Sequence, residues 1–183
     1  GDGNMKCCKE TGIYYIGEYH PYWLSGEKNP NFNKVNGGYI LDLKENNKNG
    51  IRYFVNKIEE EFKKYSNIDE FNIITIVPSS KKNVISEGLK TLVNAIAKNY
   101  DCMEYVQCLN RNRTVEKKAN GGSRSKQLEI DTIDAINKKR INRANILLFD
   151  DVTTTGKSLI ACKEILIKNG AKNVICIALG KTV

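Results

Sequence analysis

The chain has 183 residues, 40% hydrophobic and 27% charged, a balance typical of one folded domain with room for a small appended segment. No apolar run approaches the roughly 18 residues of a membrane span, which argues against an integral membrane protein. Its 29 Lys and Arg against 21 Asp and Glu leave a net charge of +8. This excess favours polyanionic partners, either nucleic acid or small phosphate and pyrophosphate ligands.

The N-terminus and the cysteines bear on the compartment. Residues 1–10 lack the apolar stretch of a secretory signal, and the origin of the four residues before Met5 is left open. The six cysteines show neither a secreted context nor the two Cys-x-x-Cys pairs of a zinc ribbon. We therefore expect reduced thiols, no zinc and a cytoplasmic location.

The first third of the chain is rich in aromatic residues. Residues 12–23 begin as a strand and break at Pro21, and turn residues then predict a surface loop as far as residue 38. The sequence YILDLK, residues 39–44, predicts a short strand. We divide the chain into an N-terminal aromatic appendage or hood, residues 1–38, and a core, residues 39–183.

From residue 51 onward, helical and strand patterns alternate. Apolar residues at i, i+3, i+4 and i+7 predict an amphipathic helix over residues 51–65, and a continuous apolar run over residues 71–78 predicts a buried strand. The later expected elements are a helix over 85–96, strands over 102–109, 145–150 and 173–179, and a helix over 157–169. This alternation predicts an α/β fold with a mostly parallel twisted sheet and helices on both faces.

The sequence ILLFDDVTTTGKSL, residues 146–159, resembles parts of two different phosphate-binding motifs. Its second half looks like a P-loop, which needs a glycine five residues before Gly156 so that the backbone can fold around a triphosphate. That position holds Asp151, and Asp150 precedes it. Because two carboxylates would repel a triphosphate, the sequence argues against ATP.

The alternative assigns the aspartates to a sugar. At the carboxyl end of a parallel strand, Asp150 and Asp151 lie where open α/β sheets bind ligands. Carboxylates suit the 2- and 3-hydroxyls of a ribose, either directly or through Mg²⁺. The residues that follow offer backbone N–H groups, hydroxyls and one cation to a phosphate monoester: Thr153, Thr154, Thr155, Gly156, Lys157 and Ser158.

This stretch resembles the phosphoribosyl pyrophosphate (PRPP) motif of type I phosphoribosyltransferases, with four apolar residues, two acidic residues and a threonine-rich phosphate loop. In these enzymes the loop after the first core strand receives pyrophosphate. The resemblance assigns that role to Pro78, Ser79, Ser80, Lys81 and Lys82.

The resemblance also implies a flexible loop that closes over the site. The basic residues 111–126 are the candidate, and the catalytic cations would be Lys81, Arg111, Arg113 and Arg124. We expect this segment to be mobile without ligand and ordered over pyrophosphate. The alternative is a solvated connection with no role in catalysis.

Within the superfamily, residues 39–183 look most like the ComF group of competence-associated phosphoribosyltransferase-like proteins. The chain departs from that group in lacking a four-cysteine zinc element and in having SSKKN after Val77-Pro78. The resemblance implies a Mg²⁺-dependent pentosyltransferase that displaces pyrophosphate from PRPP with a nitrogen nucleophile. Thr154 stands where 6-oxopurine enzymes carry an acid, which argues against hypoxanthine or guanine as the acceptor.

The acceptor would be held by the N-terminal aromatic cluster, whose members are Tyr14, Tyr15, Tyr19, His20, Tyr22 and Trp23. Such rings stack on planar bases, yet they also form small cores. Three functions stay open: a PRPP-dependent transferase, a non-catalytic PRPP or nucleotide binder acting as a regulator or DNA-uptake partner, and, less favoured, a basic nucleic-acid-binding protein. A homodimer is left open, and no membrane partner is expected.

Overall fold

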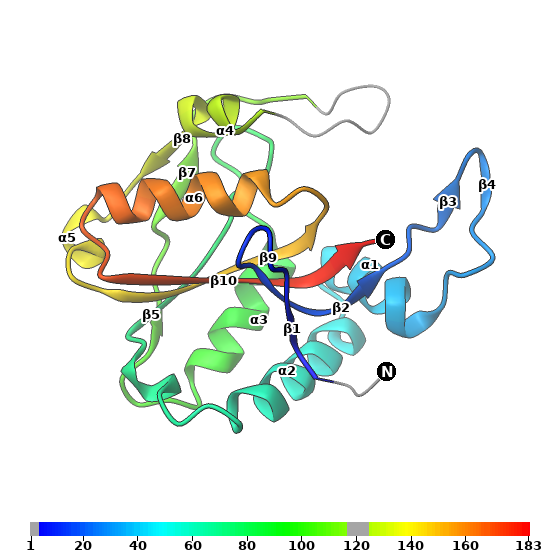
Figure 1. The fold of residues 1–183 in the computed structure, drawn as a ribbon, viewed down its shortest axis with the longest axis horizontal. Coiled ribbons are helices and arrows are strands. Elements are labelled where there is room, and N and C mark those ends of the chain that lie inside the picture. Colours follow the sequence, from blue (N-terminus) through cyan, green and yellow to red (C-terminus); the bar gives the residue numbers. More distant parts are fainter. Residues whose placement is uncertain (1–3, 117–124) are drawn as a thin grey trace.

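A computed structural model of the chain describes residues 4–116 and 125–183 (Figure 1). Its centre is a six-stranded sheet of order β1-β2-β10-β9-β5-β6. Only the β1–β2 pair is antiparallel, and the other neighbours are parallel. The strands are β1 Lys6–Cys7, β2 Tyr14–Tyr19, β10 Asn173–Thr182, β9 Asn145–Thr153, β5 Ile73–Ile76 and β6 Glu104–Tyr105.

Helices cover both faces of this sheet, so the predicted α/β class with a mostly parallel sheet is confirmed. One face packs against α1 (Tyr39–Lys44), α2 (Lys48–Phe62) and α3 (Glu87–Ala97), and the other against α6 (Lys157–Lys168). Figure 1 shows α6 above the sheet, with α2 and α3 below it. Among the described residues, no helix has the length and apolar character needed to cross a bilayer.

The core is split by the sheet into two apolar clusters. On the α6 side, Ile146 and Leu148 of β9 pack with Leu159 and Cys162. On the other side, Leu147 of β9 packs with residues of α1, α2 and α3. Adjacent strand residues point to opposite faces, so a strand buried on both faces has an unbroken apolar sequence. This explains why residues 145–150 predicted β9 so clearly.

The predicted strand over residues 39–44 is wrong, because these residues form α1. Its Tyr39, Leu41 and Leu43 alternate as in a strand, but Ile40 and Leu43 also share the spacing of one helix face. Both of those side chains are buried against the sheet. In so short a segment the two patterns coincide, and packing against α2 and α3 selects the helix.

Residues 102–144 form more and shorter helices and strands than the sequence predicted. The predicted strand over 102–109 is split between β6 and β7 (Leu109–Arg111), and β7 pairs outside the main sheet with β8 (Ile133–Ala135). The sequence patterns missed β8 and two helices. These helices are α4 (Lys126–Thr132) and α5 (Lys138–Ile141).

The N-terminal third contributes directly to the sheet through β2, which pairs in parallel with β10. Beyond β2 the chain forms a hairpin of β3 (Trp23–Leu24) and β4 (Glu27–Lys28), which extends away from the sheet in Figure 1. A π-helical turn, η1 (Lys34–Gly38), then leads into α1, and a short 3₁₀ turn, η2 (Ile68–Glu70), precedes β5. The division at residue 38 stays a prediction.

Candidate functional site

The candidate site lies where β5 ends against β9, which continues for four further residues to Thr153. Ile76 pairs with Phe149, and the Val77 N–H donates to the Phe149 carbonyl at 2.9 Å. The loop that begins at Pro78 therefore leaves the same edge of the sheet as Asp150 and Asp151. This is the edge at which open parallel sheets bind ligands.

Asp150 and Asp151 place two adjacent carboxyl groups at this edge. The Asp151 N–H donates to Asp150 Oδ1 at 2.8 Å, and the Val152 N–H donates to Asp151 Oδ1 at 2.6 Å. Burial, reinforced by the neighbouring Asp151 charge, raises the pKa of Asp150 well above its ordinary value. A bound cation or hydroxyl donors would therefore favour the ionised pair.

Lys44 supplies a cation to this pair from the C-terminal end of α1. Its Nζ lies 3.9 Å from Asp151 Oδ2, and both side chains are partly exposed. The prediction of a strand at residues 39–44 gave no reason to place Lys44 here. Only the packing of α1 on the sheet brings it to the aspartates.

The loop after β9 turns at a glycine with a left-handed backbone conformation. Gly156 has φ 84°, and a Cβ there would lie 2.8 Å from Ile13 Cδ1, so both the backbone angle and the space require glycine. The next residue begins α6, and no side chain caps the N-terminus of this helix. Its first N–H groups thus remain suited to an anion.

A pocket of about 310 Å³ opens beside this loop. It is bounded by residues 153–156, by the β1–β2 turn at Cys8, Glu10 and Thr11, and by Lys181 of β10. Thr153 is only 7% exposed. No hydrogen-bond partner for its hydroxyl occurs among the described residues. The pocket thus combines a hydroxyl without a partner, a lysine and the residue that precedes a helix.

The loop after β5 is held in place by hydrogen bonds to residues far along the chain. The Lys82 N–H donates to Thr114 Oγ1 at 3.0 Å, and the Val115 N–H donates to the Ser80 carbonyl at 2.9 Å. The Ser79 N–H donates to the Val84 carbonyl, and the Lys81 N–H to Ser79 Oγ. Several backbone donors of the loop are therefore occupied. A pyrophosphate would meet mainly the exposed side chains of Lys81 and Lys82.

Arg111 corrects the expectation of a free catalytic cation. It is fully buried in β7, and its Nη2 lies 3.1 Å from Glu129 Oε2 in an equally buried ion pair. Its Nη1 donates to Thr132 Oγ1 at 2.8 Å and its Nε donates to the Ser79 carbonyl at 3.0 Å. Because a guanidinium without such partners is costly to bury, Arg111 holds the structure together and does not face a ligand.

The other predicted cations have different placements. Arg113 is exposed after β7, next to Thr114, which contacts the loop after β5. Arg124 lies outside the described residues, as does half of the predicted closing segment, residues 117–124. The expectation that this segment orders over pyrophosphate stays a prediction.

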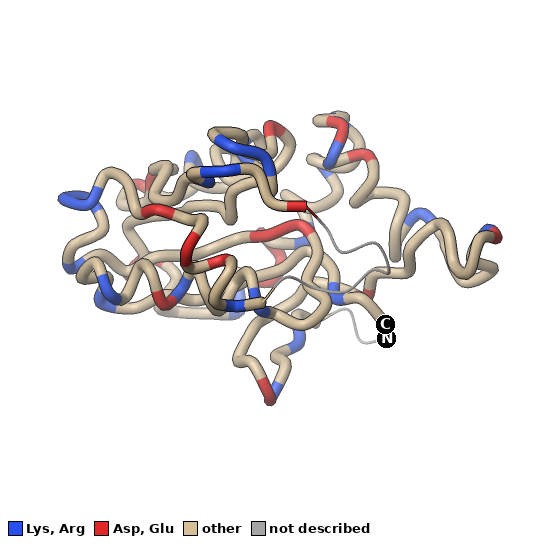
Figure 2. Tube along the Cα trace, turned by 90° about the horizontal axis from the view of Figure 1, so that it is seen from above, with Lys and Arg blue, Asp and Glu red and all other residues tan. Residues whose placement is uncertain are grey.

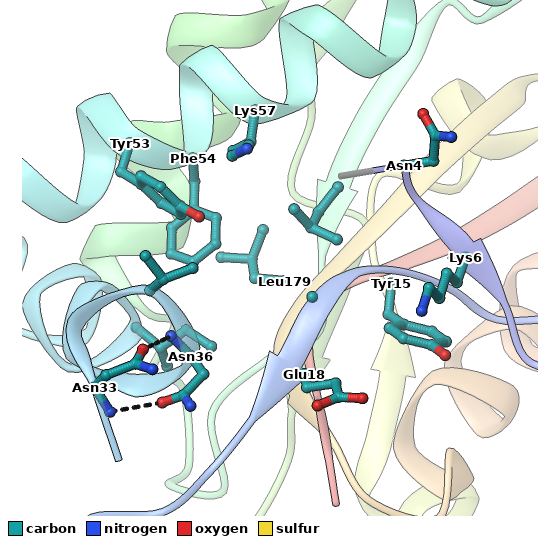
Figure 3. A pocket seen from close by; sticks show the side chains of 14 residues that line it. Asn4, Lys6, Tyr15, Glu18, Asn33, Asn36, Tyr53, Phe54, Lys57 and Leu179 are labelled. Atoms are coloured by element: carbon teal, nitrogen blue, oxygen red, sulfur yellow. Dashed lines mark hydrogen bonds between the residues drawn. The ribbon is translucent and has the colours of Figure 1, made fainter. Parts of the chain in front are cut away.

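A second and larger pocket, of about 600 Å³, is lined by residues of β2, α2 and the segment around η1 (Figure 3). Tyr53, Phe54 and Lys57 line it from α2, and Asn33 and Asn36 line it from the segment around η1. The side-chain oxygen of each asparagine accepts a hydrogen bond from the backbone N–H of the other, which forms a capping box. None of the residues predicted for the PRPP site lines this pocket.

The N-terminal aromatic cluster is distributed between core and surface. Tyr14 and Tyr19 pack against the apolar cluster on the α1 side, whereas Tyr15 packs on the α6 side. Tyr22 contacts Trp23 edge-on with ring centroids 5.0 Å apart, and Trp23 is 66% exposed. These positions are compatible with either a core or a stacking role, so the predicted hood stays a prediction.

Comparisons of the sequence with protein-family models and with curated proteins give no significant match.

Proposed function

We propose that this chain binds a phosphorylated ribose, PRPP in the first instance, and displaces pyrophosphate from it with a nitrogen nucleophile. One observation carries the proposal: the paired aspartates of β9 lie between an uncapped helix N-terminus and the loop after β5. Ribose hydroxyls, a monoester phosphate and a pyrophosphate would each find suitable partners there.

The roles of the protein groups follow from their positions. Asp150 and Asp151 would accept hydrogen bonds from the ribose hydroxyls, and residues 153–158 would hold the 5-phosphate. Lys81 and Lys82, both exposed, would neutralise the leaving pyrophosphate. Lys44 balances the carboxylates in the free protein and would shift as the ligand arrives.

The residues present are compatible with Mg²⁺. Magnesium is commonly bound through one or two carboxylates together with substrate phosphates and water, which matches Asp150 and Asp151. No larger cluster of metal-binding side chains occurs in residues 4–116 and 125–183. When bound, Mg²⁺ would neutralise charge on the pyrophosphate.

The first test is calorimetric titration with PRPP and Mg²⁺, followed by a pyrophosphate-release screen over bases and amines. We expect Asp151→Asn to weaken PRPP binding by about 10- to 100-fold, because each hydrogen bond to a charged group contributes roughly 1.5–3 kcal/mol. Circular dichroism and thermal melting of the variant check that the fold is intact. Unchanged PRPP affinity in both Asp150→Asn and Asp151→Asn variants would remove the proposal.

Mg·ATP is the matched control ligand. Because Asp151 occupies the position of the first P-loop glycine, thermal stabilisation by Mg·ATP should be smaller than stabilisation by Mg·PRPP. The reverse order would favour a triphosphate site.

A second candidate is a protein that binds PRPP or a nucleotide without turnover, as a regulator or DNA-uptake partner. The burial of Arg111 favours this second candidate, since one of the expected catalytic cations forms a buried ion pair with Glu129. PRPP binding without pyrophosphate release for any acceptor would select this candidate. Direct nucleic-acid binding has less support, because Figure 2 shows Lys and Arg spread over the trace and interspersed with acidic residues.

A further inference from the structure

The turn between β1 and β2 is tightly built against the loop after β9. The Cys8 N–H donates to the Ile13 carbonyl at 2.8 Å, and the Gly12 N–H donates to the Cys8 carbonyl at 2.7 Å. A Cβ at Gly156 would lie 3.1 Å from Thr11 Cγ2 as well as 2.8 Å from Ile13. The turn therefore forms one wall of the 310 Å³ pocket.

Cys8 is partly exposed and contributes to this wall together with Thr11. Hydrogen bonding by the Thr11 side chain and backbone, with a smaller contribution from the Lys181 charge, lowers the pKa of Cys8 below its ordinary value. A thiol with these neighbours is more readily ionised and more reactive than an isolated one. Glu10 lines the same pocket and carries a charge opposite in sign to that of Lys181.

Independent features of the pocket indicate that it takes a ligand. Thr153 is more than nine-tenths buried and lines the pocket at the end of the strand that carries the aspartates, and its hydroxyl has no partner among the described residues. Lys181 lies opposite it, since the two residues are paired in register between β9 and β10. A hydroxyl without a partner and a neighbouring ammonium group are suitable partners for a phosphate oxygen.

We propose that Cys8 is a modification site that controls the phosphate end of the proposed ribose-phosphate site, so that a Cys8 adduct and a bound phosphate exclude each other. This inference rests on the proposed function of the loop after β9. The modifying class is a low-molecular-weight disulfide. The Cys8 thiol releases its proton to solvent, and its sulfur attacks one disulfide sulfur. The S–S bond of the reagent breaks, a new S–S bond joins the adduct to Cys8, and the other half leaves as a thiolate.

The physical basis is shared space and shared charge. An adduct on Cys8 would occupy volume next to Thr154 and Gly156, where the phosphate would lie. Lys181 would favour either a thiolate or a phosphate dianion, so an ionised Cys8 and a bound phosphate would compete for the same cation. Reduction of the mixed disulfide would restore phosphate binding.

The first experiment measures alkylation of Cys8 by iodoacetamide at fixed pH, using mass spectrometry. It uses a Cys7→Ser background, because Cys7 and Cys8 fall on the same tryptic peptide. The exposed thiol of Cys102 in the same molecules is the internal control. Ribose 5-phosphate or inorganic phosphate at about ten times its measured Kd should slow alkylation of Cys8 about tenfold, since only about one site in eleven stays free. Alkylation of Cys102 should not change.

The reciprocal experiment measures ribose 5-phosphate affinity by calorimetry before and after treatment with glutathione disulfide. We expect the treated Cys7→Ser protein to lose binding and to recover it on reduction, whereas treatment should not alter the affinity of a Cys7→Ser/Cys8→Ser protein. Phosphate binding that leaves Cys8 alkylation unchanged, or a Cys8 adduct that leaves the affinity unchanged, would overturn the inference.

These outcomes are separate from failure of the proposed function. If phosphate protects Cys8 but PRPP binds no more tightly than inorganic phosphate, the inference stands and the PRPP assignment fails. If neither ribose 5-phosphate nor inorganic phosphate binds, both fail.

Discussion

The two loops at the carboxyl edge of the sheet are built in opposite ways. The loop after β5 is attached to distant residues, through Thr114, Val115 and the buried Arg111. The loop after β9 turns at Gly156 into α6 and packs against the β1–β2 turn; Thr154 shares a hydrogen bond with Thr182, and the Thr153 hydroxyl has no partner among the described residues. The polar groups of the first loop are used in hydrogen bonds within the fold, whereas the Thr153 hydroxyl of the second is not.

The difference suggests how stability and function are divided at this edge. Functional sites often keep polar groups whose burial is unfavourable in the free protein. Asp150, with its raised pKa, and Thr153 both belong to β9 and fit this description. Variants of the loop after β5 should therefore affect folding first, and polar variants around the loop after β9 should affect ligand binding first.

The largest effect is expected for Arg111→Met. It removes the cation facing Glu129 and the hydrogen bond to the Ser79 carbonyl, so the free energy of unfolding should fall by roughly 3–5 kcal/mol. Urea unfolding followed by circular dichroism measures it. The double variant Arg111→Met/Glu129→Leu is the control, because replacing both charges should recover part of the loss. If Arg111→Met is as stable as the natural chain but does not bind pyrophosphate, Arg111 is a ligand residue after all.

The next effect is expected for Gly156→Ala. Alanine would be strained at φ 84°, and its Cβ would meet Ile13 and Thr11, so we expect a loss of about 1–3 kcal/mol in the free energy of unfolding. Gly17→Ala is a matched control, since nothing lies within 4 Å of a Cβ at Gly17. A smaller cost at Gly156 than at Gly17 would show that the turn gives way easily.

Asp150→Asn should stabilise the fold at neutral pH while weakening PRPP binding. The folded-state pKa of Asp150 is raised above 3.8, so its protonated form stabilises the fold at low pH and this contribution is lost as pH rises through the folded-state pKa. The stability advantage of the asparagine variant should thus grow upward from about pH 4, by at most about 1.4 kcal/mol per pH unit. Denaturant unfolding of both proteins at several pH values measures this. An advantage that does not change with pH would mean that Asp150 is readily ionised in the free protein.

The smallest effect on stability is expected for Thr153→Val. Valine preserves the shape of the threonine side chain and removes a hydroxyl with no partner among the described residues. The free energy of unfolding should therefore change by less than about 1 kcal/mol. Binding of ribose 5-phosphate, measured by calorimetry, should weaken by about three- to tenfold, the equivalent of one hydrogen bond. Thr75→Val is the contrasting control, because the Thr75 hydroxyl accepts from the Cys108 N–H inside the core. Equal effects of the two substitutions on phosphate binding would contradict the assignment of Thr153.

Local sequence was sufficient to predict those helices and strands whose residues fit only one periodic pattern. The apolar run of β9, the helical spacing of α2 and the glycine at position 156 each reflect neighbours a few residues away, and their positions were predicted to within a few residues. The same stretch of sequence also placed Asp150 and Asp151 at the edge of the sheet, since strand, acids and helix follow one another without interruption.

Contacts between segments distant in sequence determined the parts of the fold and of the candidate site that local patterns did not predict. Residues 39–44 fit both a strand and a helix, and packing against α2 and α3 selected the helix that brings Lys44 to Asp151. Arg111 looked like a free cation because its partners, Ser79 and Glu129, are 32 and 18 residues away. Cys8 and Lys181 come from opposite ends of the chain and line one pocket only because β2 and β10 pair in parallel. Periodicity and motif spacing describe near neighbours, whereas burial and charge pairing depend on which surfaces meet in the folded chain.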